Sequence, residues 1–182
     1  MDDRLTKTSK FLSYVLRHNP DALELTVAPG GWVDVDTLVE RARAEGRSLS
    51  RSRIRHVIDA GEKTRFALSD DGTQIRAQYG HSIDVDLQLE PTAASGPLFH
   101  GTARRALAAI RRDGLRPQSR QYVHLSATRE AAERVGRRHG APVVLRVDAP
   151  ALHADGHRLY RSTDGVWLTR HVPPAALSGP VE

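Results

Sequence analysis

Two short stretches place an imidazole near a hydroxyl at the end of an expected strand. In "LFHGT", His100 is followed by Gly101 and Thr102. In "VHLS", His124 and Ser126 are two residues apart, so both point to the same face of a strand. Gly101 would let a ligand approach the backbone. A single histidine at a strand end is more often structural, but together the two stretches predict one cleft suited to a polar, aromatic ligand.

A third stretch, "FLSYVLRHNP", sets a permanent cation, Arg17, beside a titratable imidazole, His18. Asn19-Pro20 ends the preceding helix, because proline disfavours helical backbone in the residue before it. Five apolar residues are expected on the buried face of that helix: Phe11, Leu12, Tyr14, Val15 and Leu16. Two readings of the pair stay open. Cations in a last helical turn complement the macrodipole, or they handle a phosphate.

Several other chemistries lack their usual motifs. No HExxH or His-x-His spacing occurs, and no carboxylate is near His100 or His124 in the sequence, so we expect no metal site. The G-x-S-x-G elbow of hydrolases and the Rossmann glycine fingerprint are missing too. The chain has no cysteine, which excludes disulfides, thiolate zinc sites and cysteine nucleophiles.

The balance of charge favours an anionic partner. Of 27 basic residues among 182, only Lys7, Lys10 and Lys63 are lysines. Residues 1–85 hold 13 basic and 13 acidic residues, and residues 86–182 hold 14 and 9, which is the whole net charge of +5. Abundant arginine can reflect codon bias, but arginine is also the better bidentate ligand for phosphate.

No apolar run approaches the roughly 20 residues that a membrane span needs. No signal peptide is visible, so a cytoplasmic protein without membrane contact is expected. Nothing in the sequence suggests an obligate partner, and we expect a monomer.

The pattern of elements predicts an α+β protein with two lobes joined by a linker. In the first lobe, residues 1–85, we expect in order a helix over residues 5–16, a helix capped by Asp34 or Asp36, a helix capped by Ser48 or Ser50, and a hairpin around "DDGT". Three helices and a β-ribbon describe a winged-helix domain. Such a domain usually binds nucleic acid, and Arg51, Arg53 and Arg55 are expected to face solvent, or else to touch that nucleic acid.

"DVDLQLEPTAASGP" begins with alternating strand residues and continues as a Pro/Ala/Ser/Gly stretch, so residues 86–96 are expected to be a linker. Residues 97–182 form the second lobe. Its expected strands are "LFHGT", "YVHLS" and "PVVLRVD", its helices are "ARRALAAIRRDGL" and "TREAAERVGRRHG", and "HRLYRSTDGVWLTRHVPP" is read as a hairpin.

Seven blocks in the same order resemble the RNA 2′-phosphotransferase family (tRNA 2′-phosphotransferase, KptA-type): "SKFLSYVLRHNP", "GWVDVDTLV", "RFALSDDGTQIRAQYGHS", "LFHGT", "YVHLSAT", "VGRRHGAPVVLRVDA" and "DGVWLTRHVPP". The resemblance implies a winged-helix N-lobe, a C-lobe of the ADP-ribosyltransferase fold, and work in tRNA splicing or RNA repair. One of the blocks departs from the family's pattern. The family's usual "RANQGHS" is "RAQYGHS" here, so that Tyr79 replaces a glutamine.

The family reaction uses NAD⁺ as cosubstrate and an RNA with an internal 2′-phosphate. The 2′-phosphate attacks C1″ of the nicotinamide ribose and expels nicotinamide, which gives a 2′-phospho-ADP-ribosylated RNA. The ribose O2″ then attacks phosphorus and releases 2′-hydroxyl RNA and ADP-ribose 1″,2″-cyclic phosphate. The resemblance therefore implies a transferase.

The resemblance also implies roles for individual residues. Those implied as catalytic are Arg17, His18, Arg65 and Arg120, with the arginines on the phosphate and His18 in the acid–base work of the second step. Those implied to bind NAD⁺ are His100, Gly101, Thr102, His124, Ser126 and Val166. Val166 occupies the position where many ADP-ribosyltransferases carry glutamate. Arg137 or Arg138 reaches the pyrophosphate, or both are solvated.

Two alternatives remain open. One is an ADP-ribosyltransferase that modifies nucleic-acid termini or protein without removing phosphate. The other is a winged-helix regulator that senses NAD⁺ without catalysis.

Overall fold

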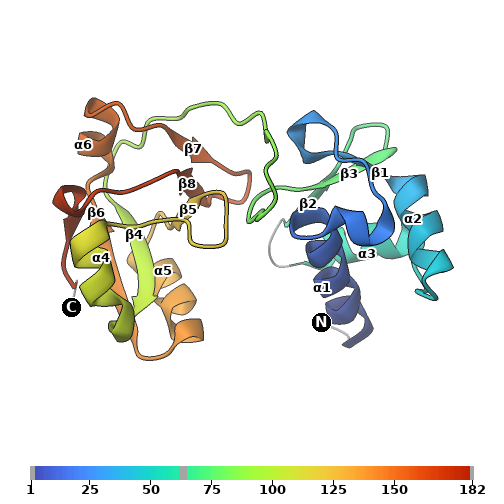
Figure 1. Cartoon of the computed structure of the whole chain (residues 1–182), viewed down its shortest axis with the longest axis horizontal. Coiled ribbons are helices and arrows are strands. Elements are labelled where there is room, and N and C mark those ends of the chain that lie inside the picture. The colour runs from blue at the N-terminus through green and yellow to red at the C-terminus, as the bar shows by residue number, and fades with distance from the viewer. Residues whose placement is uncertain (1–2, 62–64, 181–182) are drawn as a thin grey trace. The chain divides into compact units, whose positions relative to one another are not determined.

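The chain folds into two units, each with its own hydrophobic core. The computed structural model describes residues 3–61 and 65–180, and it separates into unit 1, Met1–Gln88, and unit 2, Leu89–Glu182 (Figure 1). The boundary falls within residues 86–96, the predicted linker. The predicted lobes 1–85 and 97–182 also include residues 1–2, 62–64 and 181–182, which lie outside the described residues.

The described residues of unit 1 form three packed α-helices, α1 (Asp3–Arg17), α2 (Val35–Ala44) and α3 (Arg51–Asp59). Side-chain caps begin the second and third of them. Asp34 accepts a hydrogen bond from the Thr37 amide at 2.7 Å, and Ser50 accepts one from the Arg53 amide at 3.2 Å. Between the capping alternatives left open by the sequence, the structure therefore selects Asp34 and Ser50.

A small antiparallel sheet completes unit 1, in the order β1 (Val33–Asp34), β3 (Gln74–Ala77), β2 (Phe66–Leu68). Phe66 pairs with Ala77 and Leu68 with Ile75, so the hairpin predicted around "DDGT" is confirmed. Short 3₁₀ turns occupy Pro20–Leu23 and Pro29–Gly31. Side chains of the helices and the sheet share one core that includes Leu12, Leu16, Leu38, Ile54 and Ile75.

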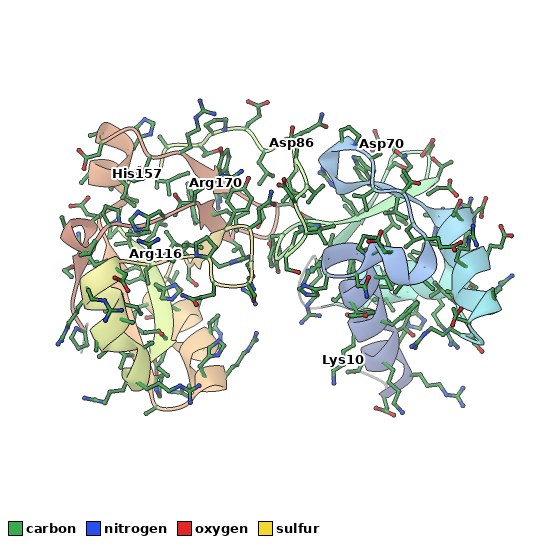
Figure 2. The ribbon with its side chains drawn as sticks, in the orientation of Figure 1. Lys10, Asp70, Asp86, Arg116, His157 and Arg170 are labelled. Atoms are coloured by element: carbon green, nitrogen blue, oxygen red, sulfur yellow. The ribbon has the colours of Figure 1, made fainter. Side chains whose placement is uncertain are left out.

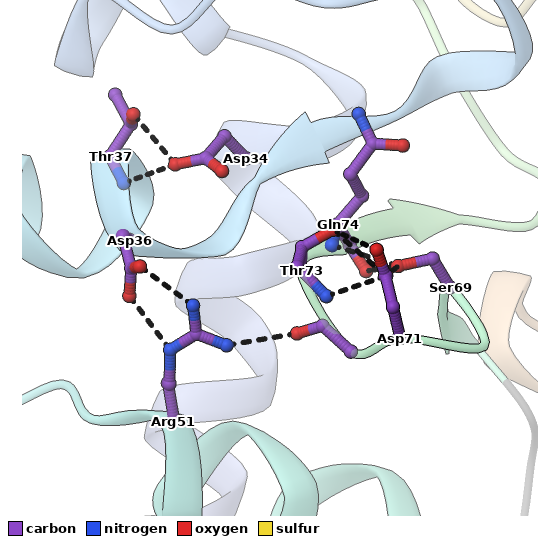
Figure 3. A network of polar contacts seen from close by, with 9 residues as sticks. Asp34, Asp36, Thr37, Arg51, Ser69, Asp71, Thr73 and Gln74 are labelled. Atoms are coloured by element: carbon purple, nitrogen blue, oxygen red, sulfur yellow. Dashed lines mark hydrogen bonds and ion pairs between the residues drawn. The ribbon is translucent and has the colours of Figure 1, made fainter.

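A polar network fastens the hairpin turn to the helices (Figure 3). Nε and Nη2 of Arg51 donate to the two carboxylate oxygens of Asp36, both at 2.7 Å, and Nη1 donates to the Gly72 carbonyl at 3.0 Å. The Asp71 carboxylate accepts from the Ser69 hydroxyl and from the Thr73 amide and hydroxyl, which lowers the pKa of Asp71 to about 2. Arg51 is thus exposed as predicted, but its guanidinium has a structural role.

The segment that joins the units forms no strand in the described part of the chain. Val85 and Leu87 are buried while Asp86 between them is exposed, so the predicted alternation is present. The prediction that these residues form a strand is nevertheless wrong, because little of their backbone pairs with other segments. The Gly30 amide donates to the Asp86 carbonyl at 2.8 Å, and the Thr92 amide donates to the Leu159 carbonyl at 2.8 Å.

Up to residue 180, where the description ends, unit 2 contains two three-stranded antiparallel sheets. The first has the order β4 (Leu98–Ala103), β6 (Pro142–Val147), β9 (Leu177–Ser178), and the second has the order β5 (Val123–Leu125), β8 (Trp167–Thr169), β7 (Leu159–Arg161). The helices are α4 (Leu107–Asp113), α5 (Arg129–Gly136) and α6 (Ala149–Ala154), with 3₁₀ turns at Arg104–Ala106, Arg137–His139 and Pro174–Ala176. Neither α6 nor β9 was predicted.

Helix α5 lies against β4 so closely that the sequence needs glycine there (Figure 1). A Cβ atom at Gly101 would lie 1.7 Å from the Ala132 carbonyl oxygen, and one at Gly136 would lie 3.0 Å from the Thr102 carbonyl oxygen. The interpretation that Gly101 makes room for a ligand is wrong on this side of the strand. The space left by its missing side chain is filled by helix backbone.

The coarse prediction of the fold class, helices combined with small sheets, is confirmed. Within the described residues, no helix has both the length and the apolar character needed to cross a bilayer.

Candidate active site

Arg17 is the last residue of α1, and three other groups hold its guanidinium. Its Cζ atom lies 5.7 Å from the centre of the Phe66 ring and 5.3 Å from the centre of the Tyr79 ring, both within cation–π range. Its Nη2 donates to the Arg65 carbonyl at 3.4 Å. The residue that replaces the family's usual glutamine, Tyr79, is therefore a direct neighbour of the predicted phosphate ligand.

His18 is exposed, and its ring is oriented by a residue far away in the sequence. Its Nδ1 lies 2.9 Å from the Ser82 hydroxyl, and either group can donate, depending on the tautomer. The Ser82 and Ile83 amides both donate to the Arg17 carbonyl, at 2.9 and 3.4 Å. Backbone hydrogen bonds thus join the end of α1 to the "GHS" segment. Because Nδ1 faces the Ser82 hydroxyl, the other ring nitrogen, Nε2, is directed away from Ser82.

A second imidazole is buried close to this pair. His81 is 1% exposed, and no described residue forms a hydrogen bond with either of its ring nitrogens. Burial, followed by the charges of Arg17 and His18, lowers the pKa of His81 to about 4. Only the smaller part of this shift, which comes from the positive charges of Arg17 and His18, would also favour an anion.

A groove of about 450 Å³ runs along α1 from this cluster. We call it the α1 groove, and the residues that line it are Thr6, Ser9, Lys10, Ser13, Tyr14, His18 and Arg65. None of these side chains is acidic. The structure therefore brings together three of the four residues predicted as catalytic, since Arg17 adjoins His18 and bonds to Arg65.

The two strand-end stretches of unit 2 also meet. Phe99 and Ser126 form a backbone bridge with N–O distances of 2.9 and 2.7 Å, and His100 Nδ1 donates to the His124 carbonyl at 3.0 Å. Because neighbours on a strand alternate between its faces, His100 and Thr102 lie on the face of β4 opposite α5. Burial lowers the pKa of His100, and its bond to the carbonyl only partly offsets this, so the surroundings favour the neutral ring.

The remaining candidates lie at turns of unit 2. Val166 ends the turn between β7 and β8, where its amide donates to the Ser162 hydroxyl at 3.0 Å. It directly precedes Trp167, which pairs with Leu125 in the β5–β8 register. Arg120 is exposed in a turn closed by its amide and the Pro117 carbonyl at 3.1 Å.

Of the two arginines considered for the pyrophosphate, Arg137 forms an ion pair with Glu133 at 2.7 Å, and Arg138 is exposed. Within residues 3–61 and 65–180, no three His, Asp or Glu side chains form a group that could hold a metal ion.

Sequence reasoning missed Lys10, Tyr14 and Ser82 as members of the unit 1 site. The prediction that Tyr14 is buried is wrong, because 47% of its surface is exposed. The helical period gives the reason. Tyr14 is four residues from both Lys10 and His18 and so lies on their polar stripe, away from Leu12, Val15 and Leu16. That spacing was a usable signal, whereas the contact of Ser82 with His18 joins residues 64 positions apart.

Comparisons with known proteins agree on one family. The sequence model described as "RNA 2'-phosphotransferase, Tpt1 / KptA family" matches residues 3–171. A protein of Acaryochloris marina is 51% identical over 173 residues, which is 95% of this chain and 96% of that protein. One of Streptomyces coelicolor is 52% identical over 179 residues, 98% of this chain and 97% of that protein. Both bear the name "Probable RNA 2'-phosphotransferase".

Proposed function

The chain belongs to the RNA 2′-phosphotransferase (Tpt1/KptA) family, and on that premise we propose that it transfers the 2′-phosphate of an RNA to NAD⁺. The observation that carries the proposal is the meeting of Arg17, His18 and Arg65 beside a groove free of acidic side chains. Such a cluster suits a phosphate with two negative charges.

In the first step, a phosphate oxygen forms a bond to C1″ of the nicotinamide ribose as the bond from C1″ to nicotinamide breaks. The phosphate is already anionic at pH 7, so this step needs positioning rather than a base. Arg17 and Arg65 are assigned to hold it. Val166 at the position of a glutamate fits this assignment, because no carboxylate is needed to activate the nucleophile.

In the second step, O2″ of the ribose attacks phosphorus and the bond from phosphorus to the RNA O2′ breaks. O2″ loses a proton and O2′ gains one, so a group that can both accept and donate is required. His18 is assigned to this work, and its oriented, exposed ring supports the assignment. The arginines offset the charge that develops on the transferring phosphoryl group.

Unit 2 is assigned to NAD⁺, which enters as a substrate. His100, Thr102, His124 and Ser126 offer hydrogen-bonding groups, and neutral His100 does not repel the positive nicotinamide ring. The winged-helix assignment of unit 1 and the ADP-ribosyltransferase assignment of unit 2 belong to the same proposal. Three helices with a small antiparallel sheet fit a winged helix, and two small antiparallel sheets fit the ADP-ribosyltransferase fold.

The test combines the purified chain with NAD⁺ and an oligonucleotide that carries one internal 2′-phosphate. We expect nicotinamide, 2′-hydroxyl RNA and ADP-ribose 1″,2″-cyclic phosphate, with no loss of activity in EDTA. RNA that gains ADP-ribose and keeps it indefinitely would favour simple ADP-ribosyl transfer. RNA that binds without any change would favour the regulator.

A further inference from the structure

The α1 groove extends well beyond the catalytic cluster. Lys10 and His18 are eight residues apart on and just after α1, which is about 12 Å along the axis. Between them the lining residues recur every three or four positions, so they form one continuous face of the helix. A single phosphate group occupies only the end of such a groove, and the rest is available to the chain that carries it.

Tyr14 is the most unusual residue of this face. Among the described residues it is the one large hydrophobic side chain that is exposed. Its ring is also held in place, because its hydroxyl accepts a hydrogen bond from Asn19 Nδ2 at 2.7 Å. A fixed aromatic ring that presents its surface to solvent next to cations is the usual platform for an unstacked RNA base.

Lys10 supplies a positive charge one helical turn away from that ring. It is exposed, it projects from α1 (Figure 2), and no ion pair joins it to a described residue. Lys7, one turn earlier, differs because it pairs with Asp3 at 2.7 Å and does not line the groove. The hydroxyls of Ser9, Ser13 and Thr6 complete a surface that can bond phosphate or ribose oxygens.

We propose that the α1 groove binds single-stranded RNA next to the 2′-phosphate, with one base stacked on Tyr14 and a neighbouring phosphodiester against Lys10. The proposal rests on the proposed function, because it takes the 2′-phosphate to lie at His18 and Arg65. It adds a reason for the enzyme to prefer a strand over a mononucleotide.

The test measures equilibrium binding without NAD⁺, so that no turnover interferes. One ligand is a short single-stranded RNA with an internal 2′-phosphate, and the other is the same RNA with abasic residues on both sides of it. The proteins are the full chain and its variants Tyr14→Leu, Tyr14→Phe and Lys10→Ala. Lys7→Ala is the matched control, and melting curves check the fold of each.

We expect Tyr14→Leu to weaken binding of the intact RNA about tenfold and to leave the abasic RNA unchanged, since stacking on one aromatic is lost. Tyr14→Phe keeps the ring and most of the affinity. Lys10→Ala lowers the slope of log affinity against log salt concentration by about 0.7, the value for one contact to a single strand. Lys7→Ala leaves the slope unchanged.

Equal losses for both RNAs in Tyr14→Leu, or none for either, would overturn the proposal. So would a hexaglutamate peptide that competes as well as the RNA, since the groove would then be a general acidic-peptide site. Turnover of the wild-type chain with NAD⁺ is measured separately. Its absence would refute the proposed function, whereas the binding series decides the role of the groove.

Discussion

The two candidate clusters are built in opposite ways. In unit 1, Arg17 and His18 lie at a helix end, and side chains from distant segments, Tyr79 and Ser82, hold them. In unit 2, His100 and His124 lie on neighbouring strands, and a bond from a ring to a backbone carbonyl holds them together. His18 is exposed, whereas His100 is buried enough for its pKa to be lowered.

This difference predicts whether a substitution in each cluster affects the reaction rate or the stability of the fold. Groups at a helix end that make few core contacts can be removed without loss of the fold, so substitutions there affect the rate. Groups on paired strands are held by the strands of their unit, and a change there is expected to affect stability first. The predictions below test this contrast, beginning with the largest expected effect.

Replacing His18 with alanine should stop the second step and spare the first. The loss of one charged transition-state contact typically costs about 3–4 kcal/mol, roughly a hundred- to a thousandfold in rate. RNA with an attached ADP-ribose should therefore accumulate, as seen by mass spectrometry during a single turnover. His56→Ala, an exposed histidine on α3, is the control. A normal product with a slightly lowered melting temperature would instead leave His18 with only a structural role at the helix end.

In unit 2, Gly101→Ala should be damaging without any contact to a substrate. Its new Cβ would overlap the Ala132 carbonyl oxygen, so α5 must move away from β4. Overpacking of this kind destabilises by about 3 kcal/mol or more. Urea unfolding should show it, and Gly96→Ala, where nothing lies within 4 Å of the added atom, should unfold like the wild type. A stable Gly101→Ala that only loses affinity for NAD⁺ would restore the ligand interpretation of this glycine.

Much of the fold could be predicted because its signals are local. The "DDGT" hairpin follows from turn chemistry within a few residues, and the caps at Asp34 and Ser50 require only neighbouring amides. Helix α6 was missed although Asp148 caps it through the Ala151 amide, because it has only six residues and one of them is Pro150. Short elements like this one are stabilised mainly by tertiary packing.

The site could be predicted only in part. The meeting of His100 with His124 was expected from matching strand patterns, although no local signal shows which strands are neighbours. The surroundings of Arg17 could not be derived, since Phe66, Tyr79 and Ser82 reach it through the fold of the sheet and the segment after it. The family resemblance identified the candidate residues, and only the structure showed which groups hold them in place.

His81 gives unit 1 a measurable dependence on pH. In the unfolded chain its imidazole takes a proton below pH 6.5, whereas in the folded chain burial, Arg17 and His18 delay this to about pH 4. The unfolded state thus binds more protons as the pH falls from 6.5 to 4, and the free energy of unfolding decreases by up to ~3 kcal/mol over that range.

His81→Gln should remove this part of the pH dependence. Comparison of urea unfolding at about pH 7.0, above the range where the two states differ, with about pH 5.5 and 4.5, within it, isolates this part, because the carboxylates titrate alike in both proteins. Parallel curves for the variant and the wild type would mean that folded His81 takes up its proton normally. The positive surroundings inferred for the Arg17–His18 pair would then be in question.

The smallest expected effect belongs to Ser82, which orients His18 but touches no substrate in the proposed reaction. A neutral hydrogen bond contributes about 0.5–1.5 kcal/mol, so Ser82→Ala should lower kcat by roughly two- to tenfold. KM for the RNA should stay the same, because the arginines assigned to the phosphate are unaffected. The Ser82 amide still donates to the Arg17 carbonyl in the variant, so the melting temperature should hardly change.

Ser82→Thr, which keeps the hydroxyl, should recover most of the rate, and Ser52→Ala on α3 is the control for loss of an exposed hydroxyl. If kcat in Ser82→Ala equals that of the wild type, the backbone hydrogen bonds alone orient the ring. If instead the melting temperature of Ser82→Ala falls clearly, side-chain contacts at the end of α1 stabilise the fold as well as orient the ring. The contrast between the two units would then not hold.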